Sequence, residues 1–213
     1  SVSSVTATAA CFSNMSLNKM KVTGIILAGG KSSRMGAEKG LQLLCGKPLI
    51  SYAIQALNGL CSEIIISSSS NAYAGFGFKI VADQFPGIGP MGGIYSSLKQ
   101  STSTQNLVLS CDLPFVTGEL MAYILKQGKD FEVAVPWEGE RHYEPLCGFY
   151  NQSVLHKLNS FIEKGNYKLP DLFEEIAINR LNINEQTGIY HPGLFLNINT
   201  PTDLELAEKQ MQK

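Results

Sequence analysis

The sequence has few charged residues and almost no net charge. Of its 213 residues, 17 are basic and 18 are acidic, which gives a formal net charge of −1, and charged side chains make up 16% of the chain. A protein without a broad positive field is not built to hold nucleic acid or an acidic membrane surface. Any site for an anion must therefore be local, and we expect no nucleic-acid partner.

Long apolar runs are also missing. No run approaches the roughly 20 residues that an apolar helix needs to cross a bilayer. The five cysteines are odd in number and widely spaced, without a C-x-x-C pair, and the three histidines share no ligand spacing. This pattern favours reduced thiols over a disulfide framework or a metal cluster. We therefore expect a cytoplasmic protein without a membrane partner.

The chain is long enough for one large domain. Its 213 residues, 44% of them hydrophobic, can bury a sizeable core. Residues 1–20 are rich in Ser, Thr and Ala, contain no acidic residue, and lack the basic start and apolar centre of a secretory signal. We expect a peripheral or disordered extension at 1–20 and a single domain at 21–213.

Segments typical of strands and helices alternate along this domain. Strands are expected at 23–28, 63–67, 79–82, 106–110, 132–135, 146–150, 176–181 and 194–198. Helices are expected at 49–60, with Pro48 suited to the first turn, from the loop at 84–93 to about 99, at 117–127, 152–163 and 170–175, and after Thr200-Pro201. This alternation predicts an α/β fold: a Rossmann-like, three-layer αβα domain with a mostly parallel sheet.

The strongest functional signal is the segment 22–39, Val-Thr-Gly-Ile-Ile-Leu-Ala-Gly-Gly-Lys-Ser-Ser-Arg-Met-Gly-Ala-Glu-Lys. An apolar, β-branched run enters a glycine pair, and basic side chains follow. A buried strand aims the backbone, glycines let it approach a ligand closely, and cations meet phosphate. The segment therefore predicts a site for a nucleoside triphosphate, with an ordinary strand-to-loop turn as the alternative.

Two familiar phosphate-binding motifs do not fit this segment. A Walker loop, G-x-x-x-x-G-K-[ST], would need its first glycine at Ile25, inside the predicted strand. The dinucleotide fingerprint G-x-G-x-x-G fails because the glycines are Gly29, Gly30 and Gly36. The predicted triphosphate site is of another type.

Two aspartates, Asp83 and Asp112, directly follow predicted strands. Ligands in open α/β sheets bind outside the carboxyl ends of the strands. A carboxylate there can hold Mg²⁺, which prefers oxygen ligands and bridges substrate phosphates. Each aspartate alone is also typical of a cap or turn, but together with the segment 22–39 they favour Mg²⁺ on Asp112. Within the loop at 84–93, the stretch 87–93 is either a mobile surface loop or a backbone surface that contacts a base.

These residues together resemble a known family. The run Leu27-Ala-Gly-Gly-Lys-Ser-Ser-Arg-Met-Gly36, with Glu38-Lys-Gly-Leu41 and Gly46-Lys-Pro-Leu49 after it, is similar to nucleotidyltransferases of the glycosyltransferase-A-like (nucleotide-diphospho-sugar transferase-like) fold. More narrowly, it resembles the molybdenum cofactor guanylyltransferases. Asp83, the loop at 89–93, Cys111-Asp-Leu-Pro114 and Asn197-Ile-Asn-Thr-Pro201 match in order and approximate spacing. The resemblance covers nearly the whole chain from Val22 onward.

The resemblance implies transfer of GMP from GTP to molybdopterin, with release of pyrophosphate and Mg²⁺ as cofactor. Other molybdenum cofactor biosynthesis or acceptor proteins are implied as further partners. Catalytic roles are implied for Arg34, Lys39 and Asp112, and a metal-binding role for Asp112. Nucleotide contacts are implied for Leu27, Ala28, Gly29, Gly30, Lys39, Ser67, Asp83, Pro90, Met91, Gly92 and Asp112. Asn197 and Asn199 match a late motif near metal and phosphates, with a turn before a helix as the alternative.

Two positions bear on the base. The family often has asparagine after its second strand, where this chain has Ser67, or Asn71 if the loop shifts. A serine offers one hydroxyl where an amide offers an acceptor and two donors. Cytosine-using relatives tend to have alanine where this chain has Gly29, so Gly29 favours GTP. We expect the missing Cβ to leave room for the larger purine.

Two further functions stay open from the sequence alone. One is cytidylyl or sugar-phosphate nucleotidyl transfer on the same fold, and the other is nucleotide binding without catalysis. Trp137 and Tyr143 flank a polar stretch, which is predicted either to line the pocket for the acceptor or to form a simple hairpin.

Overall fold

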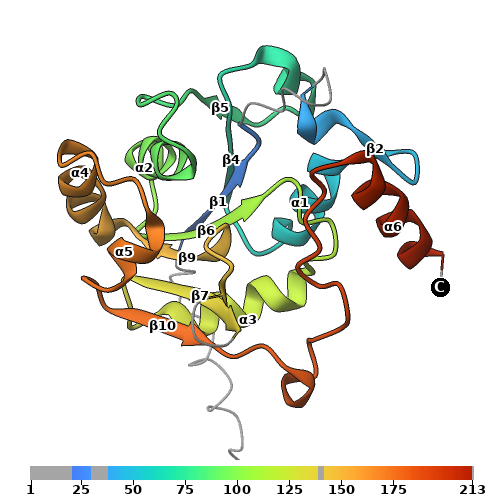
Figure 1. The fold of residues 1–213 in the computed structure, drawn as a ribbon. Helices are drawn as coiled ribbons and strands as arrows, with labels where there is room; N and C mark the ends of the chain where they lie inside the picture. The colour runs from blue at the N-terminus through green and yellow to red at the C-terminus, as the bar shows by residue number, and fades with distance from the viewer. Residues whose placement is uncertain (1–20, 30–37, 139–141, 213) are drawn as a thin grey trace, which may run out of the picture.

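A mixed β-sheet lies between two layers of helices in the computed structural model, which describes residues 21–29, 38–138 and 142–212 (Figure 1). The strand order is β10-β7-β9-β6-β1-β4-β5, and β8 pairs with β7 alone. The strands are β1 (Val22–Leu27), β4 (Glu63–Ser67), β5 (Lys79–Val81), β6 (Gln105–Ser110), β7 (Val133–Glu138), β8 (His142–Tyr143), β9 (Cys147–Asn151) and β10 (Ile178–Leu181). The expected extension at 1–20 lies outside the described residues.

Most of the sheet is parallel, as predicted. β1 pairs in parallel with β4 and β6, whereas β9 runs antiparallel to both β6 and β7. All six residues of β1 are buried, because parallel neighbours flank the strand and helices cover both of its faces. This explains why the segment reads as a continuous apolar run and not as an alternating one.

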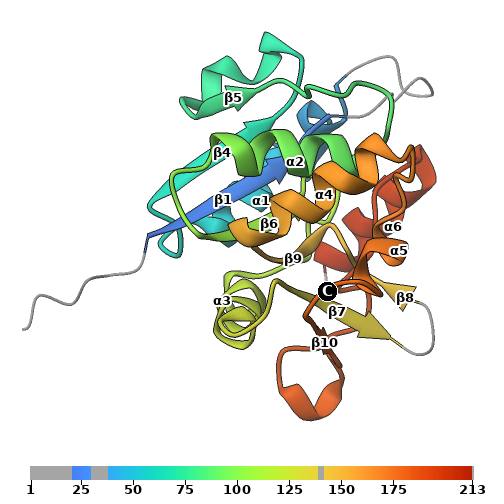
Figure 2. The same ribbon diagram turned by 90° about the vertical axis from the view of Figure 1, so that its left-hand side faces the viewer.

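The two faces of the sheet carry different helices, as Figures 1 and 2 show. Ile26 belongs to the core on the side of α1 and α3, and its neighbour Ile25 belongs to the core on the side of α2, α4 and α5. This alternation follows from the period of a strand, in which successive side chains point to opposite faces. The helices are α1 (Leu49–Leu57), α2 (Pro90–Gln100), α3 (Gly118–Gly128), α4 (Leu155–Glu163) and α5 (Leu169–Phe173).

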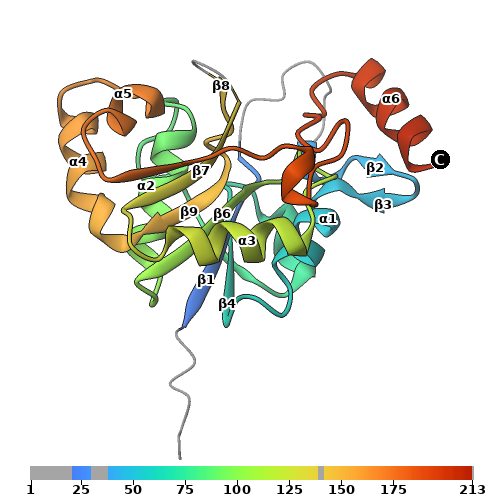
Figure 3. The same ribbon diagram turned by 90° about the horizontal axis from the view of Figure 1, so that it is seen from below.

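The C-terminal helix α6 (Pro201–Met211) lies beside the small antiparallel sheet of β2 (Leu43–Leu44) and β3 (Lys47–Pro48), as Figure 3 shows. Leu44, Leu49, Ile198 and Ala207 form a separate buried cluster there. The cluster packs the C-terminal helix α6 against the segment that follows Lys39. Four 3-10 helices complete the fold: η1 (Lys39–Leu41), η2 (Asn71–Phe76), η3 (Gln152–Val154) and η4 (Glu185–Thr187).

Threonines cap two of the helices, each at a predicted helix start. The Thr117 hydroxyl accepts a hydrogen bond from the backbone N–H of Leu120 at 3.2 Å, and α3 begins at the next residue. Thr200 caps α6, with Pro201 in the first position of the helix. Among the described residues, no helix is both long and apolar enough to span a bilayer.

The predicted strand at 194–198 is wrong. The backbone N–H groups of Leu194 and Leu196 donate to carbonyls only three residues back in the chain, which is a turn pattern. The N–H of Ile198 donates instead to the carbonyl oxygen of Asp112 at 3.0 Å. The backbone N–H groups of this segment therefore bond within local turns and to Asp112, just after β6, and the segment joins no sheet.

The start of α2 and the place of Pro48 also differ from the prediction, whereas α1 begins at Leu49 as predicted and ends earlier, at Leu57. α2 begins at Pro90, inside the predicted loop, because the first turn of a helix has no use for the N–H that proline lacks. Pro48 stands before the first turn of α1, since its backbone is extended (ψ 139°) and belongs to β3. The predicted hairpin after Trp137 is confirmed, with Trp137 paired to Tyr143 across β7 and β8.

Candidate active site

The parallel strands at the centre of the sheet end together at one edge. Register pairs Leu27 of β1 with both Ser67 and Ser110, and Ser67 in turn with Val81. The residues that follow these strand ends are therefore neighbours, although they are far apart in the sequence. A cavity of about 1150 Å³ opens at this edge, and we call it the strand-end cavity.

Most of the residues predicted to bind a nucleotide line the strand-end cavity. These are Leu27, Ala28, Gly29, Lys39, Ser67, Asp83, Pro90 and Asp112. Asn199, which was predicted to lie near metal and phosphates, also lines it. Gly87, Gly89 and Gly93 also contribute to the lining, so the glycine- and proline-rich loop and the first turn of α2 form part of the wall. The geometry thus brings together segments that the sequence shows only in isolation.

Some predicted residues lie elsewhere. The side chain of Met91 is fully buried in the core beneath α2, and Gly92 is not among the lining residues. Asn197 is not among the residues that line the cavity, although its Oδ1 accepts a hydrogen bond from Lys39. Gly30 and Arg34 lie outside the described residues, so their predicted roles stay predictions.

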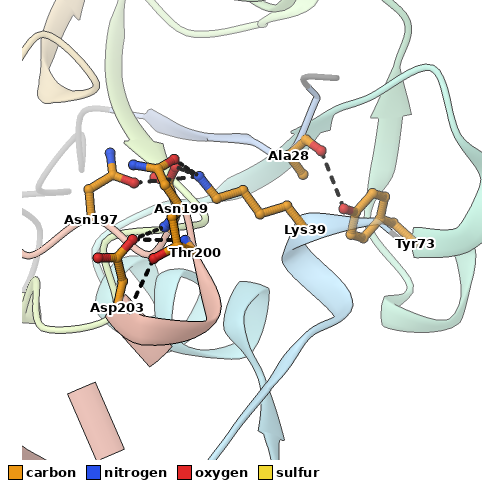
Figure 4. Close-up of polar contacts among 8 residues, drawn as sticks. Ala28, Lys39, Tyr73, Asn197, Asn199, Thr200 and Asp203 are labelled. Atoms are coloured by element: carbon orange, nitrogen blue, oxygen red, sulfur yellow. Dashed lines mark hydrogen bonds and ion pairs between the residues drawn. The ribbon is translucent and has the colours of Figure 1, made fainter. Parts of the chain in front are cut away.

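A polar cluster on one side of the strand-end cavity is centred on Lys39 (Figure 4). The ammonium group of Lys39 forms an ion pair with Oδ2 of Asp112. It also donates to Oδ1 of Asn199 at 2.6 Å and to Oδ1 of Asn197 at 3.4 Å. Two separate parts of the chain, at Asp112 and at 197–199, thus place oxygen atoms around one cation.

Asp112 has a second oxygen without a partner. Its side chain is only 11% exposed, and Oδ1 is buried with no hydrogen-bond donor in the part of the chain that the structure describes. A buried, uncompensated carboxylate oxygen is costly, and it suits a hard cation such as Mg²⁺. The described residues hold no cluster of three His, Cys, Asp or Glu side chains, so a metal here would rely on Asp112, on amide oxygens and on its substrate.

The start of α6 holds Asn199 in place. Oδ2 of Asp203 accepts hydrogen bonds from the backbone N–H groups of Asn199 at 2.9 Å and Thr200 at 2.8 Å. The Thr200 hydroxyl accepts in return from the N–H of Asp203 at 3.2 Å, which completes a capping box. These bonds lower the pKa of the Asp203 carboxyl, led by the bond from Asn199. The predicted turn before a helix and the predicted site residue are therefore the same feature.

Tyr73, which no sequence pattern singles out, joins the two described ends of the glycine-rich segment. Figure 4 shows its contact with Ala28. Its hydroxyl lies 3.3 Å from the carbonyl oxygen of Ala28 and 3.3 Å from Oε2 of Glu38, and it donates to these acceptors. The ring is fully buried, and a Cβ at position 40 would come within 2.9 Å of the hydroxyl, so Gly40 makes room for it. Burial raises the pKa of the Tyr73 hydroxyl, which therefore stays protonated and able to donate.

Two glycines in the first turn of α2 let the strand ends approach the helix. A Cβ at Gly92 would lie 2.6 Å from Oδ1 of Asp83, and one at Gly93 would lie 2.9 Å from Oγ of Ser67. Ser67 donates to the carbonyl of Gly93 at 3.4 Å. Asn71, the alternative to Ser67, is exposed at the start of η2, so Ser67 is the member of this pair at the cavity.

A second, smaller cavity of about 180 Å³ lies where β7, β8 and the segment 183–195 meet. We call it the aromatic cavity, because most of its lining is aromatic: Trp137, Tyr143, Tyr190 and Phe195, with Pro136, Glu144 and Ile183. The predicted polar stretch is therefore both a hairpin and part of a cavity wall. The sequence predicts a role for Trp137 and Tyr143 here, but it does not predict one for Glu144, because no local motif contains that residue.

The chain matches a known protein family over most of its length. Residues 24–180, which is most of the chain, match the family described as "MobA-like NTP transferase domain". A protein of Vibrio parahaemolyticus named molybdenum cofactor guanylyltransferase is 34% identical over 193 residues, which cover 88% of this chain and 95% of that protein.

Solved structures agree at the level of the fold. The structure named molybdopterin-guanine dinucleotide biosynthesis protein A, from Archaeoglobus fulgidus, aligns with a TM-score of 0.76 at 25% identity, and covers 89% of this chain and 98% of that one. A 2-C-methyl-D-erythritol 4-phosphate cytidylyltransferase from Thermus thermophilus aligns with a TM-score of 0.67 at 16% identity, over 89% and 98% of the chains. That second likeness speaks for a shared fold alone.

Proposed function

This chain belongs to the MobA-like NTP transferase family, and we propose that it transfers GMP from GTP to molybdopterin and releases pyrophosphate. The observation that carries the proposal is the meeting of Lys39, Asp112 and Asn199 at the strand-end cavity. A cation, a carboxylate and an amide oxygen at this edge suit the binding of a triphosphate and its metal. The guanine base and the molybdopterin acceptor are supported by the names of the relatives.

The reaction requires that the two substrates be positioned and that the developing charge be stabilised. It requires no covalent intermediate with the protein. An oxygen of the acceptor's terminal phosphate forms a bond to the α-phosphorus of GTP. The bond from that phosphorus to the bridging oxygen of the β-phosphate breaks, and pyrophosphate leaves with the electron pair. Negative charge grows on the leaving group, and a fixed cation beside it lowers the barrier. We assign this role to Lys39 and, through the family resemblance, to Arg34.

Mg²⁺ fits the residues around Lys39. We assign Asp112 as its protein ligand, with Asn197 and Asn199 in its vicinity, because Oδ1 of Asp112 is buried and no described residue donates a hydrogen bond to it. When bound, the ion supplies positive charge to the phosphate oxygens. The ammonium group of Lys39, which is shared among these oxygens in the free protein, can then turn to phosphate.

Cys111, the residue before Asp112, is not part of this mechanism. Its thiol is buried, and burial, followed by the charge of Asp112, raises its pKa to about 12. A thiol with such a pKa is protonated at neutral pH and is a poor nucleophile. Direct transfer between the two substrates requires no side-chain nucleophile, which agrees with this environment.

Gly29 is the residue that we assign to base selection. It lines the strand-end cavity at the end of β1. A Cβ built there would have only ordinary contacts with the protein, the nearest at 3.6 Å to the carbonyl oxygen of Ser67. The absence of a side chain is therefore not demanded by the fold, which leaves ligand size as a reason for it.

An assay of pyrophosphate release tests the proposal. The purified protein receives molybdopterin, Mg²⁺ and one of GTP, CTP, ATP or UTP, and the product is identified by mass. We expect release with GTP and formation of the guanine dinucleotide. A preference for CTP would support the cytidylyl alternative, and nucleotide binding without release with any acceptor would support a binding protein. Lys39→Ala should lose the activity, while Lys47→Ala, an exposed lysine in β3, should keep it.

A further inference from the structure

The aromatic cavity has the walls of a site for a flat ring. Four aromatic side chains line it, together with Ile183 and Glu144, and its volume is about 180 Å³. Sites for whole drug-sized ligands measure about 300–1,000 Å³. The aromatic cavity is thus large enough for a bicyclic ring but too small for a whole nucleotide or a whole dinucleotide.

One wall is fixed before any ligand arrives. The hydroxyl of Tyr143 accepts a hydrogen bond from Nε of Arg180 at 3.1 Å and donates to Oε1 of Glu174 at 3.4 Å. Its ring packs edge-to-face on Phe173, with the ring centroids 5.5 Å apart. The backbone of Tyr143 is also held in register with Trp137 across the hairpin. A wall held in this way loses little conformational freedom when a ligand stacks on it.

Two polar groups in the cavity wall, an indole N–H and a carboxyl, have unfavourable surroundings. The indole N–H of Trp137 is buried and has no hydrogen-bond partner within the part of the chain that the structure describes. Burial, followed by the charge of Asp112, raises the pKa of the Glu144 carboxyl to about 7. One side chain thus offers an unused donor, and the described residues form no side-chain hydrogen bond or ion pair with the other. Buried polar groups of this kind normally have partners.

The aromatic cavity adjoins the strand-end cavity. Glu144 lines the former, and Leu146, two residues later, lines the latter. Phe195 lines the former, and Asn199, four residues later, lines the latter. Between them, the N–H of Ile198 donates to the carbonyl of Asp112, and the charge of Asp112 reaches Glu144. An acceptor molecule can therefore have its ring in one cavity and its phosphate in the other.

We infer that the aromatic cavity binds the pterin ring of the acceptor, with Glu144 receiving its N–H donors and Trp137 donating to its ring carbonyl. This assignment rests on the proposed function. The pyrimidine edge of a pterin carries a carbonyl acceptor, a ring N–H and an exocyclic amine in a row. A carboxylate suits the two donors, because charge-assisted hydrogen bonds are strong, and the indole N–H suits the carbonyl.

The structure offers a direct probe of occupancy, because Trp137 is the only tryptophan in the chain. The full-length protein is titrated with 6-hydroxymethylpterin, and the emission of Trp137 is recorded, with N-acetyltryptophanamide as a correction for light absorbed by the pterin. We expect saturable quenching. Glu144→Gln should weaken the binding at least tenfold, and Ile183→Phe, which adds volume to the cavity wall, should do the same. Glu163→Gln, an exposed glutamate of α4, should bind as the parent does.

Transfer kinetics separate this inference from the proposed function. In the pyrophosphate-release assay, Glu144→Gln should raise the KM for molybdopterin about tenfold and leave the KM for GTP unchanged. Quenching that does not saturate, or folded Glu144→Gln and Ile183→Phe proteins with parental pterin binding and KM, would overturn the cavity assignment even if GMP transfer occurs. Saturable, Glu144-dependent pterin binding in a protein that transfers no GMP would uphold the cavity and overturn the proposed function.

Discussion

The strand-end cavity and the aromatic cavity are built in different ways. Strand ends and glycines form the first, so that backbone and small side chains make up much of its wall. Aromatic side chains form the second, and they come from the β7–β8 hairpin and from the segment 183–195. The first gathers charge around Lys39, whereas the second holds a single, poorly compensated carboxyl at Glu144.

This difference separates rate from acceptor recognition. Charge that is held beside a reacting phosphate acts on the transition state, so its loss lowers kcat. A stacked ring contributes the same binding energy before and during the reaction, so its loss raises the KM of one substrate. Changes at the strand-end cavity should therefore lower kcat, whereas changes at the aromatic cavity should raise the KM for the acceptor.

The largest effect is expected from removing charge at the strand-end cavity. Lys39→Ala or Asp112→Ala should lower kcat by a factor on the order of 10²–10³, which is typical for loss of a group that stabilises transition-state charge. Initial rates of pyrophosphate release at saturating GTP and molybdopterin measure this. Glu144→Gln at the same substrate concentrations should retain most of its kcat, which sharpens the comparison.

Controls for these two variants come from exposed residues of the same type. Lys47→Ala and Asp130→Ala remove equal charges away from either cavity and should keep parental rates. Circular dichroism and thermal melting establish that each variant is folded. Near-parental kcat in a folded Lys39→Ala or Asp112→Ala protein would remove that residue from the mechanism.

A smaller effect is expected at Tyr73, which positions the glycine-rich segment without lining the cavity. Tyr73→Phe removes the hydroxyl that reaches both Ala28 and Glu38, so the two ends of the segment lose a common anchor. We expect kcat/KM for GTP to fall about tenfold and stability to fall by about 1 kcal/mol, the usual contribution of a buried hydrogen bond. Steady-state kinetics with each substrate varied in turn, and urea unfolding, measure both.

The substrate that responds is the informative part. Tyr73→Phe should change the kinetics of GTP and leave the KM for molybdopterin as it is, since the Tyr73 hydroxyl bonds to Ala28 and Glu38 and Tyr73 does not line the aromatic cavity. Tyr167→Phe, an exposed tyrosine, is the matched control. An unfolding energy that falls while GTP kinetics stay parental would reduce Tyr73 to a packing role.

The strand-end cavity could be predicted from the sequence because its parts are local. The strand at 63–67 was predicted with its observed bounds, and Asp83 and Asp112 emerge at one edge as expected. Parallel register alone brings such strand ends together, so short motifs carry the information. The cap at Thr200 likewise depends on neighbours three residues apart.

The aromatic cavity and the Tyr73 contact could not be predicted in the same way. The segment 194–198 has the composition of a strand, but its N–H groups go to turns and to Asp112, a choice that depends on tertiary structure. Tyr73 and Glu144 belong to no spacing pattern, and their roles come from burial beside residues far away in the chain. Sequence periodicity reports neighbours along an element and carries no record of such contacts.

A modest change in base preference is expected from Gly29→Ala. The added Cβ has only ordinary contacts in the protein, so the fold should tolerate it, and it adds a methyl group to a residue that lines the cavity. We expect the affinity for GTP to fall about fivefold and the affinity for CTP to change less. A change the size of one methyl group alters a binding free energy by at most about 1–3 kcal/mol. Competition binding with GTP and CTP at fixed Mg²⁺ measures this, and an equal loss for both nucleotides would contradict the role in base selection.

The smallest effect is expected on stability, from the Glu144 carboxyl that the proposed acceptor site requires. Its pKa is raised from 4.5 to about 7 in the folded protein, so folding retains a proton there. The parent is therefore most stable, relative to a neutral variant, below pH 4.5, and it loses that stability as the pH rises through 7. Glu144→Gln should thus leave stability nearly unchanged at pH 5 and raise it at pH 8. A shift of this size corresponds to about 3 kcal/mol, and screening at a partly exposed carboxyl reduces the expected gain to about 1 kcal/mol.

Urea unfolding of Glu144→Gln at pH 5 and pH 8 measures this gain, with Glu163→Gln as an exposed control that should show no pH-dependent difference. The same substitution is expected to weaken pterin binding, so one change should stabilise the fold and damage the site. This opposition is what a binding residue held in an unfavourable environment should show, since its cost to folding is offset only when the ligand supplies donors. A variant that is equally stabilised at both pH values would show that Glu144 carries no ionisation cost, and the contrast between the two cavities would then rest on their lining alone.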